Sequence, residues 1–216
     1  MRSFLFLAFL NCIVLAGNAQ QRYTITYSTK KASYDTLRSG ATLLPMQLVI
    51  RDSVSYTYYP DIPIRPGLKN TVPLGSVYWP KSTFINTISC TQIFPFGEFD
   101  KPKKQVLVVD SCRKGDWVIY DGTKDILGYK CVMAKGLSNG ITVQAWFAPE
   151  LPASFAPHFT TQLPGTILEY WYEGRDFIVT AVEIKREAVE IVEPNFCKRI
   201  SRKEYDKIIQ KRKGHY

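Results

Sequence analysis

Apolar and polar residues alternate along much of the chain, and this alternation predicts a protein built mainly of β-strands. In residues 22–27, tyrosine and isoleucine side chains share one face of an extended segment while arginine and threonine side chains take the other. Residues 46–50 and 54–58 repeat the arrangement. A period of two is that of a half-buried strand, so three strands are expected here.

Five prolines, at positions 60, 63, 66, 73 and 80, interrupt the pattern after these strands. Proline has no backbone N–H to donate to a strand ladder, so this stretch is expected to contain irregular or edge segments.

The clearest strand pattern runs from residue 105 to residue 192. Its short segments are rich in aromatic and β-branched residues and cover 106–109, 117–120, 126–134, 141–147, 167–171, 177–184 and 188–192. The dipeptides Asp121-Gly122, Asn139-Gly140 and Glu173-Gly174 lie between them and favour the positive φ of tight hairpins. The pattern therefore predicts a mainly β fold, in which antiparallel meander strands form a curved sheet or an incomplete barrel.

One short helix is expected at the C-terminal end. Ser201-Arg202-Lys203-Glu204 is a capping-box sequence, and Tyr205, Ile208 and Ile209 follow on one side at helical spacing. We expect this helix, within a basic tail of about residues 200–216, to dock its apolar side on the sheet.

Composition supports a globular protein of one-domain size, with 216 residues, 45% hydrophobic and 22% charged. Most of the net charge of +9 comes from the last nineteen residues, where the basic residues are Lys198, Arg199, Arg202, Lys203, Lys207, Lys211, Arg212 and Lys213. Nucleic-acid binding would need basic residues spread over a folded face with aromatic stacking groups, so no nucleic-acid partner is expected.

Residues 1–19 have the pattern of a removable signal peptide. Arg2 precedes an apolar run over 4–17, and Gly17-Asn18-Ala19 has small residues where a signal peptidase reads them. Cys12 lies inside the apolar run, which argues against lipidation, and the run is too short to span a membrane. We therefore expect one domain over residues 20–216, exported to the periplasm or outer envelope or secreted, and not an integral membrane protein.

Four cysteines remain after residue 19. An even number in an exported chain favours two disulfides among Cys90, Cys112, Cys131 and Cys197, and the pairing stays open. None is spaced as C-x-x-C, so neither a redox motif nor a zinc ribbon is predicted.

The chain has few residues for acid–base or metal chemistry. Its histidines are His158 and His215, and it has no metalloprotease, nucleophile-elbow, Walker or dinucleotide-binding motif. A single histidine in a proline-rich loop is more often a surface or packing residue than a catalyst. We therefore assign no catalytic residue, metal or cofactor and expect a protein that is not an enzyme.

Three blocks in the middle of the chain resemble the GLPGLI family of Bacteroidota, also called the Porphyromonas-type domain of unknown function. They are residues 126–134, residues 143–152 and residues 163–168. The naming hexapeptide stands here as 162–167, with its first glycine and second leucine replaced. The resemblance implies an exported envelope protein without an established active site.

The eighteen residues from Ala148 to Gly165 are expected to form a long loop without secondary structure of its own, and such loops are often functional. Together with their flanks they supply our candidate binding residues, which are Trp146, Phe147, Pro149, Pro152, Phe155, Phe159, Leu163, Pro164, Gly165 and Ile167. The loop would form either a structural corner or an apolar rim around a groove.

Two functions are consistent with these expectations. The first is a non-catalytic binding or interaction module with a protein partner in the outer membrane or envelope. The alternative is a periplasmic carrier for an apolar or lipid-like ligand, and a hydrolase is less favoured because no catalytic motif is present.

Overall fold

A computed structural model describes residues 22–31, 45–60, 82–97, 105–112, 116–138, 140–187, 189–195 and 197–213. The predicted signal segment with Cys12, the prolines at 63, 66, 73 and 80, and His215 lie outside the described residues.

The described residues form fourteen strands and one helix. In chain order these are β1 (Arg22–Lys31), β2 (Met46–Arg51), β3 (Val54–Tyr58), β4 (Ser82–Asn86), β5 (Thr91–Phe96), β6 (Val106–Ser111), β7 (Val118–Ile126), β8 (Tyr129–Ser138), β9 (Ile141–Ala148), β10 (Phe155–Ala156), β11 (Phe159–Thr160), β12 (Thr166–Tyr172), β13 (Phe177–Lys185), β14 (Arg199–Ser201) and α1 (Arg202–Lys213).

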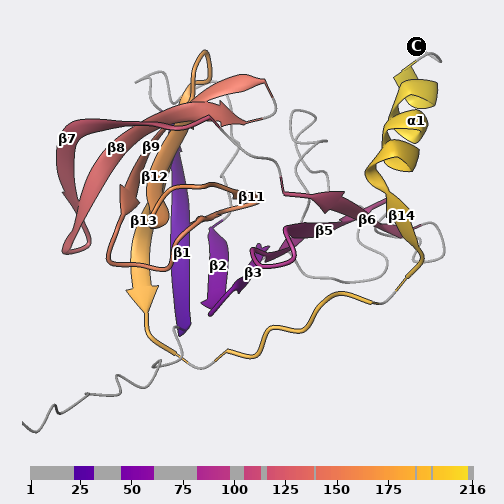
Figure 1. Cartoon of the computed structure of the whole chain (residues 1–216), viewed down its shortest axis with the longest axis horizontal. Helices are drawn as coiled ribbons and strands as arrows, with labels where there is room; N and C mark the ends of the chain where they lie inside the picture. Colours follow the sequence, from indigo (N-terminus) through magenta and orange to yellow (C-terminus); the bar gives the residue numbers. More distant parts are fainter. Residues whose placement is uncertain are drawn as a thin grey trace, which may run out of the picture.

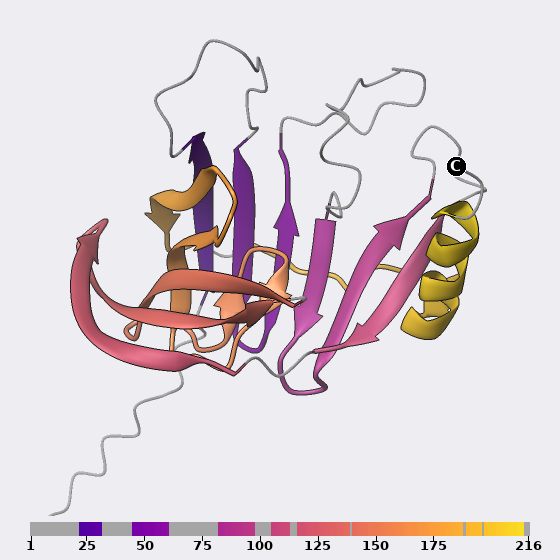
Figure 2. The same cartoon turned by 90° about the horizontal axis from the view of Figure 1, so that it is seen from above.

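All the strands belong to one open, curved sheet (Figures 1 and 2). Its strand order is β14-β6-β5-β4-β3-β2-β1-β13-β12-β9-β8-β7, with the short β10 and β11 off this path. Neighbours pair antiparallel, except that β14 runs parallel to β6 and β10 runs parallel to β12. The predicted fold class is confirmed as a mainly β protein with a curved sheet and a short C-terminal helix.

Strand β1 joins the two halves of the sheet because it pairs with β2 on one side and β13 on the other. Its alternating Tyr23, Ile25 and Tyr27 are buried as the sequence pattern predicts. The Tyr27 hydroxyl donates a hydrogen bond of 2.7 Å to the carbonyl oxygen of Ile167, which ties β1 to β12. Burial raises the pKa of Tyr27 well above its ordinary value, so this hydroxyl stays protonated as a donor.

The main core lies against β1, β2, β8, β9, β12 and β13, and two smaller clusters lie near β4 to β6. Helix α1 packs on the smaller cluster around Phe94 and Val108. The rings of Tyr205 and Phe94 are arranged edge to face, with their centres 5.7 Å apart. The predicted capping box is present, because Ser201 and Glu204 exchange side-chain and backbone hydrogen bonds. The expectation of a docked C-terminal helix is thus confirmed.

One predicted turn is wrong. The chain does not turn at Asp121-Gly122, because β7 continues through both residues and accommodates them with a register shift against β8 between Ile119 and Thr123. The turn lies instead at Leu127 and Gly128, which have φ values of 53° and 83°. A bulge absorbs the extra residues without reversing the chain.

Other boundary predictions have mixed outcomes. Gly174, with a φ of 74°, lies in the predicted turn between β12 and β13, and Gly140, with a φ of 79°, immediately precedes β9. The predicted strand over 188–192 is wrong, because residues 189–192 form no strand.

The stretch Ala148–Gly165 has secondary structure of its own, which corrects the expectation of a structureless loop. Phe155 pairs with Thr160 and Ala156 with Phe159, so β10 and β11 form a small hairpin. Phe155 also pairs in parallel with Thr166 at the start of β12. The hairpin is therefore hydrogen-bonded to the sheet.

Candidate functional site

The candidate binding residues proposed from the sequence lie mostly inside the protein. Phe147, Phe155, Phe159, Leu163 and Ile167 belong to the main core cluster. Pro152 and Gly165 are also buried, whereas Pro149 and Pro164 are exposed and Trp146 is half-buried. The buried members pack the hairpin onto the sheet, so the structure gives them the corner role rather than that of an accessible rim.

His158 anchors the tip of this hairpin. Its Nδ1 lies 3.1 Å from the Thr83 hydroxyl and its Nε2 lies 3.2 Å from the Tyr59 hydroxyl. The side-chain amide of Gln92 donates to the His158 carbonyl oxygen at 3.0 Å. Burial lowers the pKa of His158 to about 3, so the ring is neutral and packs as a hydrogen-bonded structural residue.

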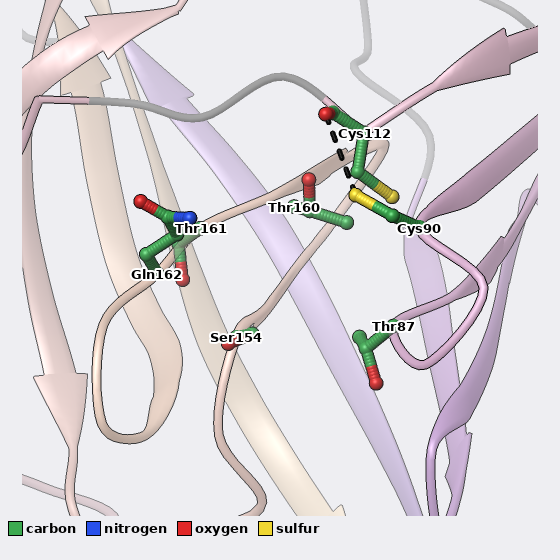
Figure 3. Close-up of a pocket in the computed structure, with 7 residues that line it drawn as sticks. All are labelled: Thr87, Cys90, Cys112, Ser154, Thr160, Thr161 and Gln162. Carbon is green, nitrogen blue, oxygen red and sulfur yellow. Dashed lines mark hydrogen bonds between the residues drawn. The ribbon is translucent and has the colours of Figure 1, made fainter.

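A small cavity lies between the hairpin and the turn after β4. It has a volume of about 120 Å³ and is lined by Thr87, Cys90, Cys112, Ser154, Thr160, Thr161 and Gln162 (Figure 3). Backbone hydrogen bonds hold the part of the lining that belongs to the hairpin region. The Ser154 N–H donates to the carbonyl oxygens of Leu163 and Gly165 at 3.0 and 3.1 Å.

The chemistry of this cavity is that of hydroxyl, amide and thiol groups. None of its seven lining residues is a carboxylate or an imidazole, so the lining offers no general acid or base of the usual kind. Ligand pockets commonly hold about 300–1,000 Å³, so this one has room for only a small polar group.

All four cysteines in the described part of the chain are free thiols. Cys90 and Cys112 lie together at the cavity, Cys131 is buried on β8, and Cys197 precedes β14. Burial, with the neighbouring Cys90 thiol adding to it, raises the pKa of Cys112 to about 12, and burial raises the pKa of Cys131 to about 11.

A second surface lies on the opposite face of the sheet from the hairpin, and we call it the tryptophan face. It consists of Trp146 and Gln144 on β9 with Glu169 and Trp171 on β12. The register pairs Trp146 with Glu169 and Gln144 with Trp171. Because cross-strand partners share a face, the two half-buried indoles alternate with polar side chains in a checkerboard.

Charged side chains surround this face in fixed positions. Lys124 Nζ lies 2.6 Å from Glu169 Oε1 and 6.0 Å from the centre of a Trp146 ring. The Thr180 hydroxyl donates to Glu169 Oε2 at 3.0 Å, so both carboxylate oxygens have a partner.

A second ion pair lies further along the same face. Lys135 Nζ lies 2.5 Å from Glu173 Oε1, and the side-chain amide of Gln144 donates to the same oxygen at 3.2 Å. The hydrogen bond from Lys135 lowers the pKa of Glu173, and the same bond raises the pKa of Lys135. Glu173 and Lys135 are therefore both ionised at neutral pH.

Sequence reasoning found Trp146 but missed Trp171 and Gln144. The available signal was the alternation itself, since residues 142, 144 and 146 and residues 169 and 171 are the second faces of two predicted strands. The prolines of the intervening loop predicted an accessible rim there, but most of the apolar residues of that loop are buried.

No metal-binding cluster and no membrane helix were found in the described part of the chain. It holds no group of three or more histidine, cysteine, aspartate or glutamate side chains arranged for a metal ion. No helix there is both long enough and apolar enough to cross a membrane.

The family described as "N-glycanase peptide, N-terminal domain" matches residues 75–211 of the sequence. The match spans more than half of the chain, including every strand from β4 onward and most of α1. The chain belongs to this N-glycanase N-terminal domain family. A comparison with curated proteins found no match.

Two solved structures of PNGF-II have a fold similar to that of this chain. The one in a C2 space group has a TM-score of 0.61 and 19% sequence identity, and the match covers 89% of this chain and 33% of that one. The one in a P21 space group has a TM-score of 0.56 and 16% identity, with 88% and 34% covered. The chain thus spans about a third of the length of the solved structures it matches.

The resemblance to the GLPGLI family is wrong, because the family match and the fold both point to the N-glycanase N-terminal domain. The residue blocks that suggested it belong to β7, β8, β9 and β12, where sheet packing selects small and aliphatic residues. Ala134 and Ala145, for example, pair across β8 and β9 and are both fully buried. Such a pattern records a packed antiparallel sheet and is not specific to one family.

Proposed function

We propose that the protein is an exported, non-catalytic carbohydrate-binding module that engages N-linked glycans, the class of glycan on which an N-glycanase acts. The observation that carries this proposal is the tryptophan face, where two half-buried indoles alternate with amide and carboxylate groups. Membership in the N-glycanase N-terminal domain family supports the choice of glycan.

The chemistry of the tryptophan face suits a sugar chain. A pyranose ring presents an apolar C–H face, which packs on an indole, and a rim of hydroxyls, which need hydrogen-bond partners. Diagonal neighbours on adjacent strands lie about 7–8 Å apart, so a short glycan can contact both Trp146 and Trp171. Gln144 lies opposite Trp171 and two residues before Trp146, and it is hydrogen-bonded to Glu173, so both polar side chains can exchange hydrogen bonds with sugar hydroxyls.

The arrangement favours binding without bond cleavage. Glycoside-processing sites depend on a carboxylate that is free to donate or accept a proton. Glu169 has both oxygens held by Lys124 and Thr180, and the cavity beside the hairpin has no carboxylate in its lining.

The described cavities do not favour the alternative of a carrier for an apolar ligand. The cavity beside the hairpin is small and lined largely by polar residues, and a second, open groove is lined by Tyr56 and residues 192–195. Neither offers an enclosed apolar volume for an acyl chain.

The test is a titration of the protein with a released high-mannose N-glycan, followed by calorimetry and by intrinsic tryptophan fluorescence. We expect Trp171→Ala and Gln144→Ala each to weaken binding by about tenfold or more, since each removes one contact of about 1.4 kcal/mol. Tyr56→Ala is the matched control, because Tyr56 is a half-buried aromatic residue on β3, outside the tryptophan face.

Three outcomes would contradict the proposal or part of it. Unchanged affinity in both face variants, with normal melting curves, would move the binding site elsewhere. Release of glycan from a glycoprotein by the wild-type chain, seen as a mobility shift, would show that the protein is an enzyme. If the intact mass of the exported protein differs from the mass of a chain that starts at Gln20, the predicted signal cleavage is wrong.

A further inference from the structure

Cys90 and Cys112 face each other across neighbouring strands. Cys90 ends the turn after β4 and directly precedes β5, and Cys112 directly follows β6. The ladder of β5 and β6 pairs Thr91 with Ser111, so one further step places Cys90 opposite Cys112. The backbone confirms this step, because the Cys112 N–H donates to the Cys90 carbonyl oxygen at 2.8 Å.

The two thiols also meet. The Cys90 thiol donates to the Cys112 carbonyl oxygen at 3.5 Å, and the two sulfur atoms lie side by side at the edge of the cavity (Figure 3). Directly opposed residues of an antiparallel pair have Cα atoms about 4.5–5.5 Å apart, and a disulfide needs about 4.4–6.8 Å. The backbone hydrogen bond between Cys90 and Cys112 therefore holds the pair near the spacing that a disulfide needs, with Cys90 in the turn that ends at β5.

Cys131 has no cysteine partner within reach among the described residues. It lies on β8, next to the edge strand β7, whereas β5 and β6 lie near the opposite edge of the sheet. Its thiol lies 3.5 Å from the Tyr129 carbonyl oxygen of the same strand, within the main core cluster, whereas Cys90 and Cys112 line the cavity beside the hairpin. Cys131 is also fully buried, so a dissolved oxidant cannot reach it.

Cys197 is separated from the pair along the length of β6. Strand β14 runs parallel to β6 with Arg199 opposite Leu107, so Cys197 lies near residue 105, before β6 begins. Cys112 follows the other end of β6, seven residues further, which is roughly 23 Å at 3.3 Å per residue. A bond between Cys197 and either member of the pair would require the sheet to come apart.

We infer that Cys90 and Cys112, which are thiols in the structure, are oxidised in an oxidising compartment to the single intrachain disulfide of the described domain, whereas Cys131 and Cys197 remain thiols. The sequence predicted two disulfides among the four cysteines, whereas this inference keeps only one of them.

Formation of the bond needs a disulfide oxidant of the kind present in oxidising compartments. The exposed Cys90 thiolate attacks one oxidant sulfur and releases the other half as a thiol. Cys112 then attacks the Cys90 sulfur and releases the second half, so that two protein thiols and one disulfide become one protein disulfide and two small thiols.

The bond would fix one wall of the small cavity. It links two residues that are 22 positions apart and encloses β5 and β6, and its sulfurs lie beside Thr160 on the hairpin. Reduction would free the turn after β4 from the end of β6, so the oxidised protein is expected to melt at a higher temperature.

The test is differential alkylation of the full chain after incubation with oxidised glutathione. Free thiols are first blocked with N-ethylmaleimide under denaturing conditions, the protein is reduced, and the released thiols are labelled with iodoacetamide. We expect the second label on Cys90 and Cys112 and the first label on Cys131 and Cys197, by peptide mass spectrometry. Reduction should lower the melting temperature by roughly 5–10 °C.

Single variants separate this pairing from the alternatives. Cys90→Ser should leave Cys112 with the first label, whereas Cys131→Ala should leave the labelling of the pair unchanged. The inference is overturned if Cys90 and Cys112 carry the first label in the wild type. It is equally overturned if either is linked to another cysteine, or if Cys90 retains glutathione while Cys112 stays free.

Discussion

Gly165 shows how a single residue without a side chain holds the hairpin against the sheet. Gly165 is not among the glycines with a positive φ in the described residues, so the reason for glycine here is steric. A Cβ at this position would collide with the carbonyl oxygen of Ala148 and lie 2.7 Å from its carbonyl carbon. The strand β9 and the start of β12 therefore approach closely only because residue 165 lacks a Cβ.

Gly165→Ala is expected to lower the free energy of unfolding by about 2–3 kcal/mol, because the backbone must move apart within a packed region. Urea denaturation followed by fluorescence measures the change. Gly122→Ala is the control, since its Cβ would meet the nearest atoms at an ordinary 3.5 Å. That variant should remain within about 1 kcal/mol of the wild type, and equal stability of both variants would refute the steric explanation.

His158 makes stability depend on pH in a predictable direction. Burial lowers its folded-state pKa to about 3, whereas an unfolded histidine titrates near 6.5. Between these values the unfolded chain binds a proton that the folded chain does not. The free energy of unfolding should therefore fall as pH falls below 6.5, by up to about 1.4 kcal/mol per pH unit, and His158 should add no slope above neutral pH.

The variant His158→Gln isolates this contribution. It removes the titrating ring while keeping groups that can bond to Thr83 and Tyr59. Between pH 7.5 and pH 5.0 we expect the variant to lose about 2 kcal/mol less stability than the wild type, measured by urea denaturation. An identical pH profile for both proteins would mean that the pKa of His158 is not lowered in the folded state.

Individual strands and the helix were predicted well where their signals are local. The alternation in β1 and the capping box before α1 each depend on a few neighbouring residues. The turn at Asp121-Gly122 failed because a bulge in β7 accommodates the same dipeptide that elsewhere reverses the chain. Sequence alone cannot decide between these outcomes, since both depend on the partner strand.

The candidate site was predicted less well, because it is assembled from two strands. The length and prolines of the stretch Ala148–Gly165 predicted an exposed loop, yet Phe155 and Leu163 fill the core. The tryptophan face needs the register between β9 and β12, which includes a shift between Ile167 and Glu169. That shift places Glu169 opposite Trp146, and no local sequence pattern predicts the shift.

At the scale of the whole molecule, the sheet is open and its two edges are protected differently. The β14 edge is only three residues long and is followed by α1, which packs on the neighbouring cluster through Tyr205 and Ile208. The β7 edge is nine residues long, and within the described residues no strand pairs with its outer side. An exposed strand edge offers unpaired N–H and C=O groups to another chain, so β7 is the expected place of self-association.

The exposed apolar residues of β7 allow a test of self-association through this edge. Ile119 is 50% exposed, and its neighbours Val118 and Tyr120 are similarly open. Ile119→Lys should reduce association at high concentration, measured by light scattering, without lowering the melting temperature, because a lysine on an edge strand repels a second copy. Val182→Lys is the matched control, since Val182 is 45% exposed on β13, which is flanked by strands on both sides. If the two variants associate equally, the contact between copies does not run through the β7 edge.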